Sequence, residues 1–333
     1  MRKTAIIISV ILITLSNIQA QVRKSGINSL AFLKVGVGAR QVGIGSAATT
    51  IKGDPNMIFW NPAGIVLSDE KLAVSFTYNR WIADINQVAV GAVYNLKGIG
   101  NIGVGIISFG LSGISADRDL LPPDLAYLQI DQQTSATYSF RDFALILSYA
   151  RNVTDLLSLG FNLKYLNERI DDLSANAFAI DLGANYKITD FWNIGARLSN
   201  LGSDIKYYDI ASPIPLSFSI GTSLFYTFQK SFTGRLFIDV VQPQDLPQLF
   251  FTGVEFDALN LISARFGYKF NYSGTKDKGT SWRDPIETTI EGFSAGVGAK
   301  IEFGNYKFSF DYAFTQMKIL DSVHRITVGI GLK

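Results

Sequence analysis

A two-residue hydrophobic rhythm recurs about fourteen times along this chain of 333 residues, and it constrains the fold more than any other feature. In residues 157–165, for example, apolar or aromatic side chains occupy every second position, and polar or small residues stand between them. Successive side chains of a β-strand point to opposite faces, so each such segment has one apolar face and one polar face. Helical spacing explains none of these segments.

The connections between the predicted strands alternate between short turns and longer polar loops. We expect strands near residues 72–78, 87–96, 101–111, 140–151, 156–166, 176–187, 191–200, 216–228, 233–241, 249–256, 262–270, 293–303, 306–314 and 323–332. Bacterial outer-membrane barrels have short periplasmic turns and long extracellular loops, and an even strand number returns both termini to the periplasm. The pattern predicts an all-β fold: an antiparallel transmembrane β-barrel of about 14 strands. A soluble β-sandwich would show less regular connections.

The first residues predict export from the cytoplasm. Arg2 and Lys3 precede an apolar run from Ala5 to Leu15, and we expect cleavage after the small residue Ala20, as in a secretory signal peptide. We therefore expect a signal peptide at 1–20, an N-terminal hatch or plug segment at 21–70 and the barrel at 71–333. The apolar run is too short to span a bilayer as a helix.

Charge and composition exclude several functions. Loss of Arg2 and Lys3 with the signal peptide leaves 28 basic and 28 acidic residues, so nothing favours nucleic acid as a partner. The chain has no cysteine and a single histidine, His324, which makes metal or thiol catalysis improbable and a histidine on the rim of the barrel the better interpretation. We expect no enzyme and no cofactor. The 38 Phe and Tyr residues fit the aromatic girdles of a barrel in contact with outer-membrane lipid.

A glycine-rich segment before the first strand carries a family resemblance. The run from Ala31 to Gly45, followed by Asp54-Pro55-Asn56 and by Phe59-Trp60-Asn61-Pro62-Ala63-Gly64, resembles the PorV/PorQ family. That family is related to FadL-type outer-membrane transporters, which are fourteen-stranded barrels with an N-terminal hatch.

The resemblance implies two functions. PorV-like members act in type IX secretion, where they accompany exported cargo at the outer-membrane translocon. The leading hypothesis is therefore a secretion component whose partners are translocon subunits and cargo proteins. The alternative is a FadL-like transporter, which passes a hydrophobic small molecule through the hatch and a lateral opening in the wall. A purely structural outer-membrane protein is a third possibility.

The candidate hatch residues are explained by backbone chemistry. Pro62 fixes one dihedral, Gly64 permits the next bend, and Asn61 can bond its own backbone, so this turn is interpreted as structural rather than ligand-binding. Trp60 beside it is expected to anchor the segment in the lumen. The remaining candidates of this motif are Gly36, Gly38, Arg40, Gly43 and Gly45.

The glycines of this motif do not form a phosphate loop, because the strand and helix of a βαβ unit are missing around them. Close packing against the barrel wall explains them better, and we expect Arg40 and Lys34 to pair with inward-facing carboxylates. Nine charged residues fall on the polar face of the predicted strands, where they should face the lumen, because exposing Arg or Lys to lipid costs about 2–4 kcal/mol. They are Lys164, Asp181, Arg197, Asp239, Arg265, Lys269, Lys300, Glu302 and Asp311.

Two long connections are the candidate partner loops. Loops carry function while the scaffold positions them. The connection at 112–139 offers Asp117, Asp119, Asp124 and Tyr127, and the connection at 271–292 offers Trp282. The spacing of the carboxylates does not match an EF-hand, so no calcium site is expected.

Overall fold

The computed structural model contains one closed barrel. It describes residues 28–67, 69–115, 137–207, 209–228, 231–246, 248–270, 291–317 and 320–333. The wall strands are β1 (Leu72–Arg80), β2 (Asn86–Leu96), β3 (Gly100–Ser115), β4 (Thr137–Asn152), β5 (Leu157–Ile170), β6 (Leu173–Thr189), β7 (Trp192–Gly202), β10 (Ser217–Phe228), β11 (Phe232–Pro243), β12 (Leu249–Ala258), β13 (Ile262–Phe270), β14 (Glu291–Phe303), β15 (Tyr306–Met317) and β16 (Val323–Leu332).

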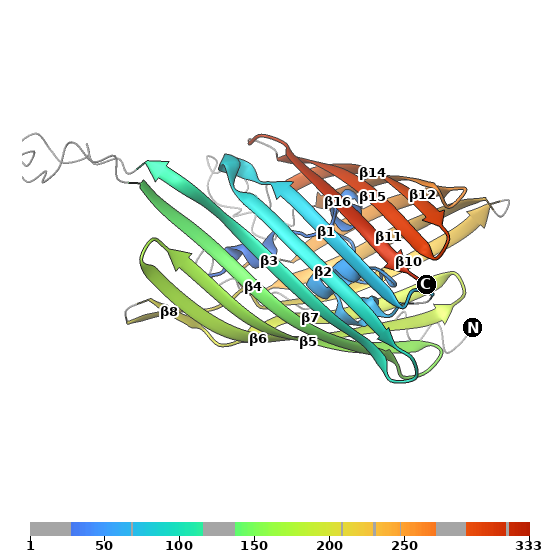
Figure 1. The fold of residues 1–333 in the computed structure, drawn as a ribbon, viewed down its shortest axis with the longest axis horizontal. Coiled ribbons are helices and arrows are strands. Elements are labelled where there is room, and N and C mark those ends of the chain that lie inside the picture. The colour runs from blue at the N-terminus through green and yellow to red at the C-terminus, as the bar shows by residue number, and fades with distance from the viewer. Residues whose placement is uncertain are drawn as a thin grey trace, which may run out of the picture.

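All fourteen predicted wall strands are present. Each pairs antiparallel with its neighbours in the chain, β7 pairs with β10, and β1 pairs with β16 to close the ring (Figure 1). The closing pair runs in continuous register from Leu72 opposite Leu332 to Arg80 opposite His324. The prediction of a fourteen-stranded antiparallel barrel is therefore confirmed.

The two faces of the wall differ as the alternation predicts. In β5, Leu159, Phe161 and Leu163 are exposed on the outside, whereas Asn162 and Lys164 are buried on the inside. The same outward band of large apolar side chains continues around the barrel, which is the surface that a bilayer covers. None of the helices in the described residues has the length and apolar character needed to cross a membrane.

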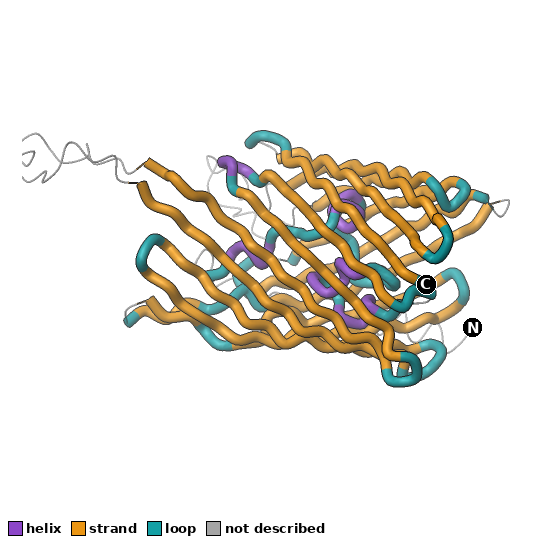
Figure 2. The backbone as a smooth tube through the Cα atoms, in the orientation of Figure 1, coloured by secondary structure: helices purple, strands orange, loops and turns teal. Residues whose placement is uncertain are grey.

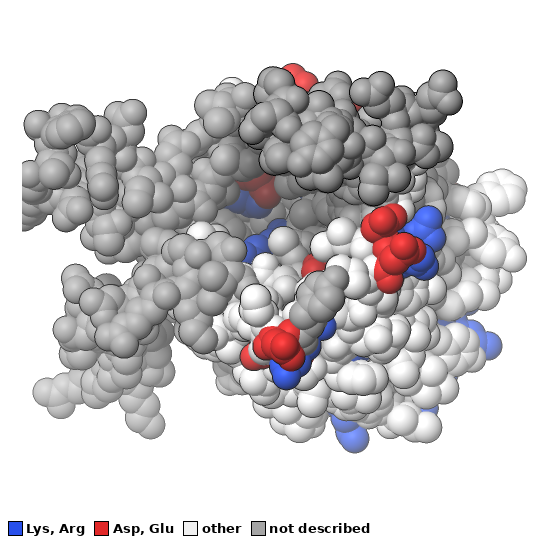
Figure 3. Space-filling model, turned by 90° about the vertical axis from the view of Figure 1, so that its left-hand side faces the viewer, with Lys and Arg blue, Asp and Glu red and all other residues white. Residues whose placement is uncertain are grey.

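The two ends of the barrel differ in their connections. At one end, which we call the turn end, short connections such as 97–99 and 304–305 join the strands, and Lys333 lies beside them (Figure 1). At the opposite end, which we call the loop end, the connections include 116–136 and 271–290, whose structure lies outside the described residues. Figure 3 looks onto the loop end and shows acidic and basic side chains close together there.

Residues 28–67 lie inside the barrel. They form the short helices η1 (Ala31–Lys34), α2 (Ala39–Gly43), η2 (Pro55–Phe59) and η3 (Pro62–Ile65), which the ring of strands surrounds (Figure 2). A barrel of this width cannot fill its interior with the side chains of its own wall. The N-terminal segment supplies much of the core instead, including Leu30, Phe32, Ile44, Met57, Ile58 and Ile65.

Two features of the loop end were not predicted from the sequence. Strands β8 (Ile205–Tyr207) and β9 (Ile210–Ser212) form a small separate hairpin in the connection between β7 and β10. A short helix, η4 (Ile82–Asp84), lies between β1 and β2. Strands β3 to β6 have 14 to 17 residues, whereas β1, β2 and β16 have 9 to 11, so the rim is higher on one side. Figure 1 shows this difference at the loop end.

Candidate functional site

Four pairs of opposed glycines line the inner wall where the N-terminal segment touches it. They are Gly91 with Gly105, Gly160 with Gly183, Gly195 with Gly221, and Gly253 with Gly267. A Cβ atom built on any of them would meet residues 44–63 at 3.1 Å or less. Glycine therefore lets the backbone of the N-terminal segment approach the wall directly on several sides.

The Asn61-Pro62 turn lies against the pair of Gly160 and Gly183. Asn61 Oδ1 accepts a hydrogen bond from the Ala63 nitrogen at 3.1 Å and caps helix η3, whose first residue is Pro62. A Cβ on Gly183 would lie 2.0 Å from Asn61 Oδ1, and a Cβ on Gly160 would lie 2.5 Å from the Pro62 carbonyl carbon. The turn thus caps a helix and packs directly on the wall.

Gly45 lies against the pair of Gly253 and Gly267, at the other side of the lumen. Its nitrogen donates to Ser294 Oγ at 3.1 Å, and its φ of 66° is in the left-handed region that favours glycine. A Cβ on Gly267 would lie 1.9 Å from the Gly45 nitrogen. Neither residue can therefore gain a side chain without moving the segment or the wall.

The other glycines of the motif are packed within the segment or against the wall. A Cβ on Gly64 would lie 2.4 Å from the Ile51 carbonyl oxygen, and one on Gly36 would lie 2.9 Å from Val42. Gly43 faces the backbone of Gly296 in β14. Gly38, with a φ of 87°, precedes helix α2. These contacts accord with close packing and not with a phosphate loop.

Arg40 projects from α2 into a buried ionic network. Its Nε and Nη2 donate to Glu255 Oε2 and Oε1, both at 2.9 Å. Glu255 is fully buried and also accepts from Arg265 at 2.7 Å and from Arg235 at 3.0 Å. Burial opposes the charge on Arg40, but the Glu255 carboxylate outweighs burial and raises the pKa of Arg40 above its ordinary value. The wall thus holds the segment by a bidentate, charge-assisted contact.

Other polar contacts attach the segment elsewhere. Asp239 of β11 accepts from the Thr49 nitrogen at 2.9 Å and from its hydroxyl at 2.7 Å. Thr327 of β16 accepts from the Ala39 nitrogen at 2.8 Å. Lys34 pairs with Asp245 near the loop end, as expected from the sequence.

The charged residues predicted to face the lumen lie on the inward register of the wall. Four of them are buried in two ion pairs, Lys164 with Asp181 at 2.6 Å and Arg265 with Asp311 at 2.6 Å. Glu302 differs, because it lies near the turn end, is 56 % exposed and pairs with Lys333. His324 is also exposed, and its Nδ1 lies 2.6 Å from the hydroxyl of Tyr312.

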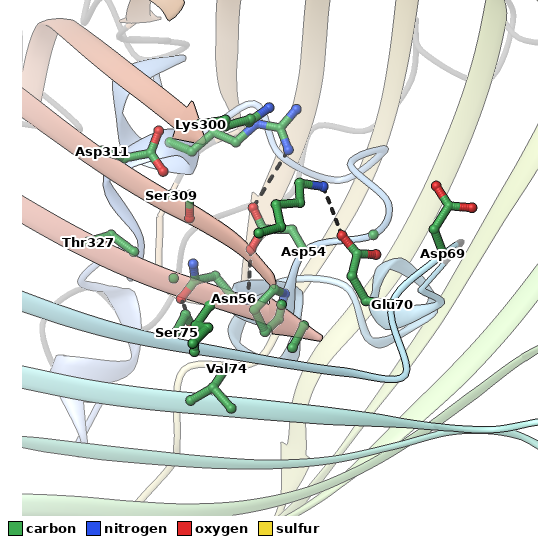
Figure 4. Close-up of a pocket in the computed structure, with 18 of the residues that line it drawn as sticks. Asp54, Asn56, Asp69, Glu70, Val74, Ser75, Lys300, Ser309, Asp311 and Thr327 are labelled. Carbon is green, nitrogen blue, oxygen red and sulfur yellow. Dashed lines mark hydrogen bonds and ion pairs between the residues drawn. The ribbon is translucent and has the colours of Figure 1, made fainter. Parts of the chain in front are cut away.

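A polar cavity of about 290 Å³ lies between the segment and strands β1, β14, β15 and β16, toward the turn end (Figure 4). Lys307 donates to Glu70 at 2.8 Å beside it, and Arg40 lies 3.6 Å from Asp54. Lys52 also lines it, and burial, with a contribution from Lys187, lowers the pKa of Lys52. The lining suits water and ions better than an apolar ligand.

A larger cavity of about 420 Å³ lies on the other side of the segment, toward the loop end. Its apolar lining includes Phe59, Trp60 and Phe251. Trp60 donates its indole Nε1–H to the Val37 carbonyl at 2.8 Å and presents its ring to Arg197, whose guanidinium carbon lies 5.3 Å from the ring centre. Trp60 therefore connects the segment to the wall and forms part of this cavity.

The candidate partner loops cannot be placed beside these cavities. Asp117, Asp119, Asp124, Tyr127 and Trp282 lie outside the described residues. In the part of the chain that the structure describes, no group of three or more histidine, aspartate or glutamate side chains could hold a metal ion.

The sequence matches one family model over residues 18–233, which is more than half of the chain. The model is described as type IX secretion system protein PorV. The chain belongs to the PorV family. A search of curated proteins found no match.

The PorV-family barrel is similar in fold to FadL-type proteins. The Pseudomonas putida toluene transporter TodX shares 12 % identity at a TM-score of 0.54, with 93 % of this chain and 98 % of that chain covered. The Ralstonia pickettii toluene transporter TbuX shares 15 % at 0.54, with 89 % and 97 % covered. A Pseudomonas aeruginosa FadL homologue shares 11 % at 0.52, with 89 % and 98 % covered. Family and fold together make the protein an outer-membrane β-barrel.

The residues that sequence reasoning missed are those on the wall. The opposed glycines, among them Gly183 and Gly267, occupy inward positions where other strand positions carry polar residues. That recurrence in the polar register was visible in the sequence, but it did not tell which wall glycine would face which part of the segment. The role of Glu255 as the acceptor of Arg40 gave no sequence signal, because 215 residues separate the two.

Proposed function

We propose that this protein is an outer-membrane component of type IX secretion that binds exported cargo or translocon subunits at its loop end. The family match supports the pathway. The observation that carries the proposal is the filled lumen: glycine contacts and buried ion pairs attach residues 28–67 to the wall on several sides. A barrel filled in this way is better suited to present a rim to a protein partner than to conduct one through its interior.

We further propose the organisation that the sequence predicts. Residues 1–20 are a signal peptide, 21–70 a luminal plug and 71–333 the barrel, with the turn end and Lys333 on the periplasmic side. The Ser29 nitrogen bonds the Pro213 carbonyl at 3.1 Å and the Leu30 nitrogen bonds Glu168 at 2.8 Å, near the loop end. The plug therefore runs from the extracellular part of the lumen toward the periplasmic part. The N-terminus, for which the strand count predicts a periplasmic position, belongs to residues outside the described ranges.

The rim gives the partner loops their proposed role. The connection at 116–136 joins β3 and β4, which belong to the higher side of the rim. We assign Asp117, Asp119, Asp124 and Tyr127 in it, and Trp282 in the second connection, to partner binding. The protein itself catalyses no reaction and needs no cofactor in this role.

Affinity purification from native outer membranes tests the proposal. The wild-type protein should copurify with translocon subunits or exported cargo, identified by mass spectrometry. Deletion within 116–136 or within 271–290 should reduce this recovery, while heat-modifiable migration in gel electrophoresis shows that the barrel still assembles. Replacing residues 153–156, the exposed connection between β4 and β5 at the opposite end, by a glycine-serine turn of the same length serves as the matched control. Full recovery of partners with both loop deletions would reject the assignment.

A second candidate is passage of a hydrophobic small molecule. The cavity of about 420 Å³ with Phe59, Trp60 and Phe251 in its lining favours it, since small-molecule sites are concave and mostly apolar. Uptake of a radiolabelled aromatic hydrocarbon by cells with and without the protein tests this role. Equal uptake rates would argue against it.

A further inference from the structure

The cavity toward the loop end contains a cation without a carboxylate partner. Three of its four basic side chains form ion pairs: Lys34 with Asp245, Lys164 with Asp181, and Lys269 with Glu291. The fourth is Arg197 of β7, and no carboxylate of the described residues lies within 4.0 Å of it. Among the described residues, one positive charge of this cavity therefore has no carboxylate in direct contact.

The hydrogen-bonding capacity of Arg197 is also mostly unused. A guanidinium carries five N–H donors, and only Nη1 has a partner, the Trp60 carbonyl at 3.4 Å. Arg197 is 8 % exposed, and its Nε has no partner. A buried charge without hydrogen bonds is costly, so such a group is normally satisfied by a ligand, an ion or water.

A second unpartnered donor lies on the same face of the same strand. Ser199 follows Arg197 by two residues, so both side chains point into the lumen. Ser199 is 8 % exposed, its Oγ has no partner, and it lines the same cavity. The two side chains together offer a charged donor and a hydroxyl to one acceptor group.

Apart from Arg197, Ser199, the three paired lysines, Glu291 and the polar residues Ser46, Asn200 and Ser217, the lining is apolar. Aromatic rings of Phe59, Trp60 and Phe251 and the aliphatic side chains of Ile107 and Val241 surround the same space. We propose that this cavity binds a small organic anion with a single acid group on a compact apolar body, with the acid group held by Arg197 and Ser199. The apolar body contacts the rings, and the volume of about 420 Å³ is within the range of small-molecule sites. This binding does not depend on the secretion role, or on whether the molecule crosses the barrel.

The competing explanation is internal neutralisation by Asp239. Asp239 and Asp181 both act on Arg197 from beyond 4.0 Å. Asp181 is paired with Lys164, and the Oδ2 of Asp239 is engaged by the nitrogen and the hydroxyl of Thr49, whereas its buried Oδ1 has no partner in the described residues. If Asp239 and water alone satisfied Arg197, the cavity would show no preference for an anion over a neutral molecule of the same shape. This difference is measurable.

Calorimetric titration of the full-length protein in lipid nanodiscs tests the proposal, with 4-phenylbutyrate and the neutral 4-phenylbutanol as probes. The wild-type protein should bind the acid at least about tenfold more tightly than the alcohol, because only the acid offers Arg197 a charge-assisted hydrogen bond. Arg197→Gln should abolish this preference, and Ser199→Ala should reduce it. Arg151→Gln changes an exposed arginine near the turn end and should leave it unchanged.

Heat-modifiable migration checks that each variant forms a barrel. If Arg197→Gln fails to assemble, Val241→Phe provides a second test, because it fills the cavity with a ring and leaves Arg197 in place. Val241→Phe should weaken binding of the acid at least about tenfold. Equal affinity of the wild-type protein for acid and alcohol, or no binding of either, would overturn the proposal. So would a preference for the acid that survives Arg197→Gln.

Discussion

Arg40 of the luminal segment and Glu255 of strand β12 meet through two parallel hydrogen bonds of 2.9 Å. Arg40 is one of three arginines on this carboxylate, the others being Arg235 and Arg265 of the wall. Because those two would remain, loss of Arg40 leaves Glu255 compensated, whereas loss of the Glu255 charge leaves three arginines with fewer acceptors. The two partners of this ion pair therefore contribute unequally to stability, and we call this difference the asymmetry of the pair.

This asymmetry predicts different stabilities for two variants. Glu255→Gln should lower the free energy of unfolding by about 3–5 kcal/mol, the usual cost of breaking a buried pair, and Arg40→Gln should cost clearly less. Denaturant unfolding followed by tryptophan fluorescence measures both. Arg80→Gln is the control, since it removes an exposed arginine from its pair with Asp84, and it should leave the unfolding curve unchanged. Equal losses for Arg40→Gln and Glu255→Gln would contradict the asymmetry.

Glu70 predicts a pH dependence at the turn end. Burial alone would raise the pKa of Glu70, but the hydrogen bond and charge of Lys307 outweigh it and hold the pKa below the ordinary value of 4.5. A depressed pKa in the folded state stabilises the protein at pH values above 4.5, and this stabilisation is lost as the pH falls through the lower folded value. The thermal midpoint of the wild-type protein should therefore decrease on acidification more than that of Glu70→Gln. Parallel pH profiles would show that this contact contributes nothing.

Gly267 tests how tightly residues 28–67 are held against the wall. The Cβ of Gly267→Ala would meet the backbone of Gly45 and Ile44 at 1.9 to 2.3 Å, so the segment has to shift. Overpacking of this kind costs about 1–3 kcal/mol. We expect higher single-channel conductance in planar bilayers and faster proteolysis of the segment. Gly234→Ala is the matched control, because its Cβ points outward and the nearest atom, on Phe256, is 3.6 Å away. Conductance that stays at the wild-type level in Gly267→Ala would show that residues 28–67 adapt to the added methyl group without opening a path through the lumen.

The alternation of residues predicted the wall because lipid on one side and the lumen on the other impose opposite chemistry on successive side chains. Local turn chemistry predicted that Asn61 can bond its own backbone, because the partner, Ala63, is only two residues away. The cavity toward the loop end could not be predicted in this way, because residues distant in sequence form it. Arg197 and Trp60 are 137 residues apart, and only closure of the barrel brings them together. The β8–β9 hairpin was missed because three-residue strands are too short to show alternation.

The orientation of the barrel can be tested directly because the chain contains no cysteine. Asn305 lies in a turn at the turn end and Asp171 lies at the loop end, and both are exposed. With the turn end in the periplasm, a membrane-impermeant maleimide should label Asp171→Cys on intact cells and Asn305→Cys only after the outer membrane is opened. The reverse labelling pattern would show that the barrel has the opposite orientation, with the partner loops in the periplasm. It would also place the cavity beside Arg197 toward the periplasm, so the same labelling decides from which side an anion would reach Arg197.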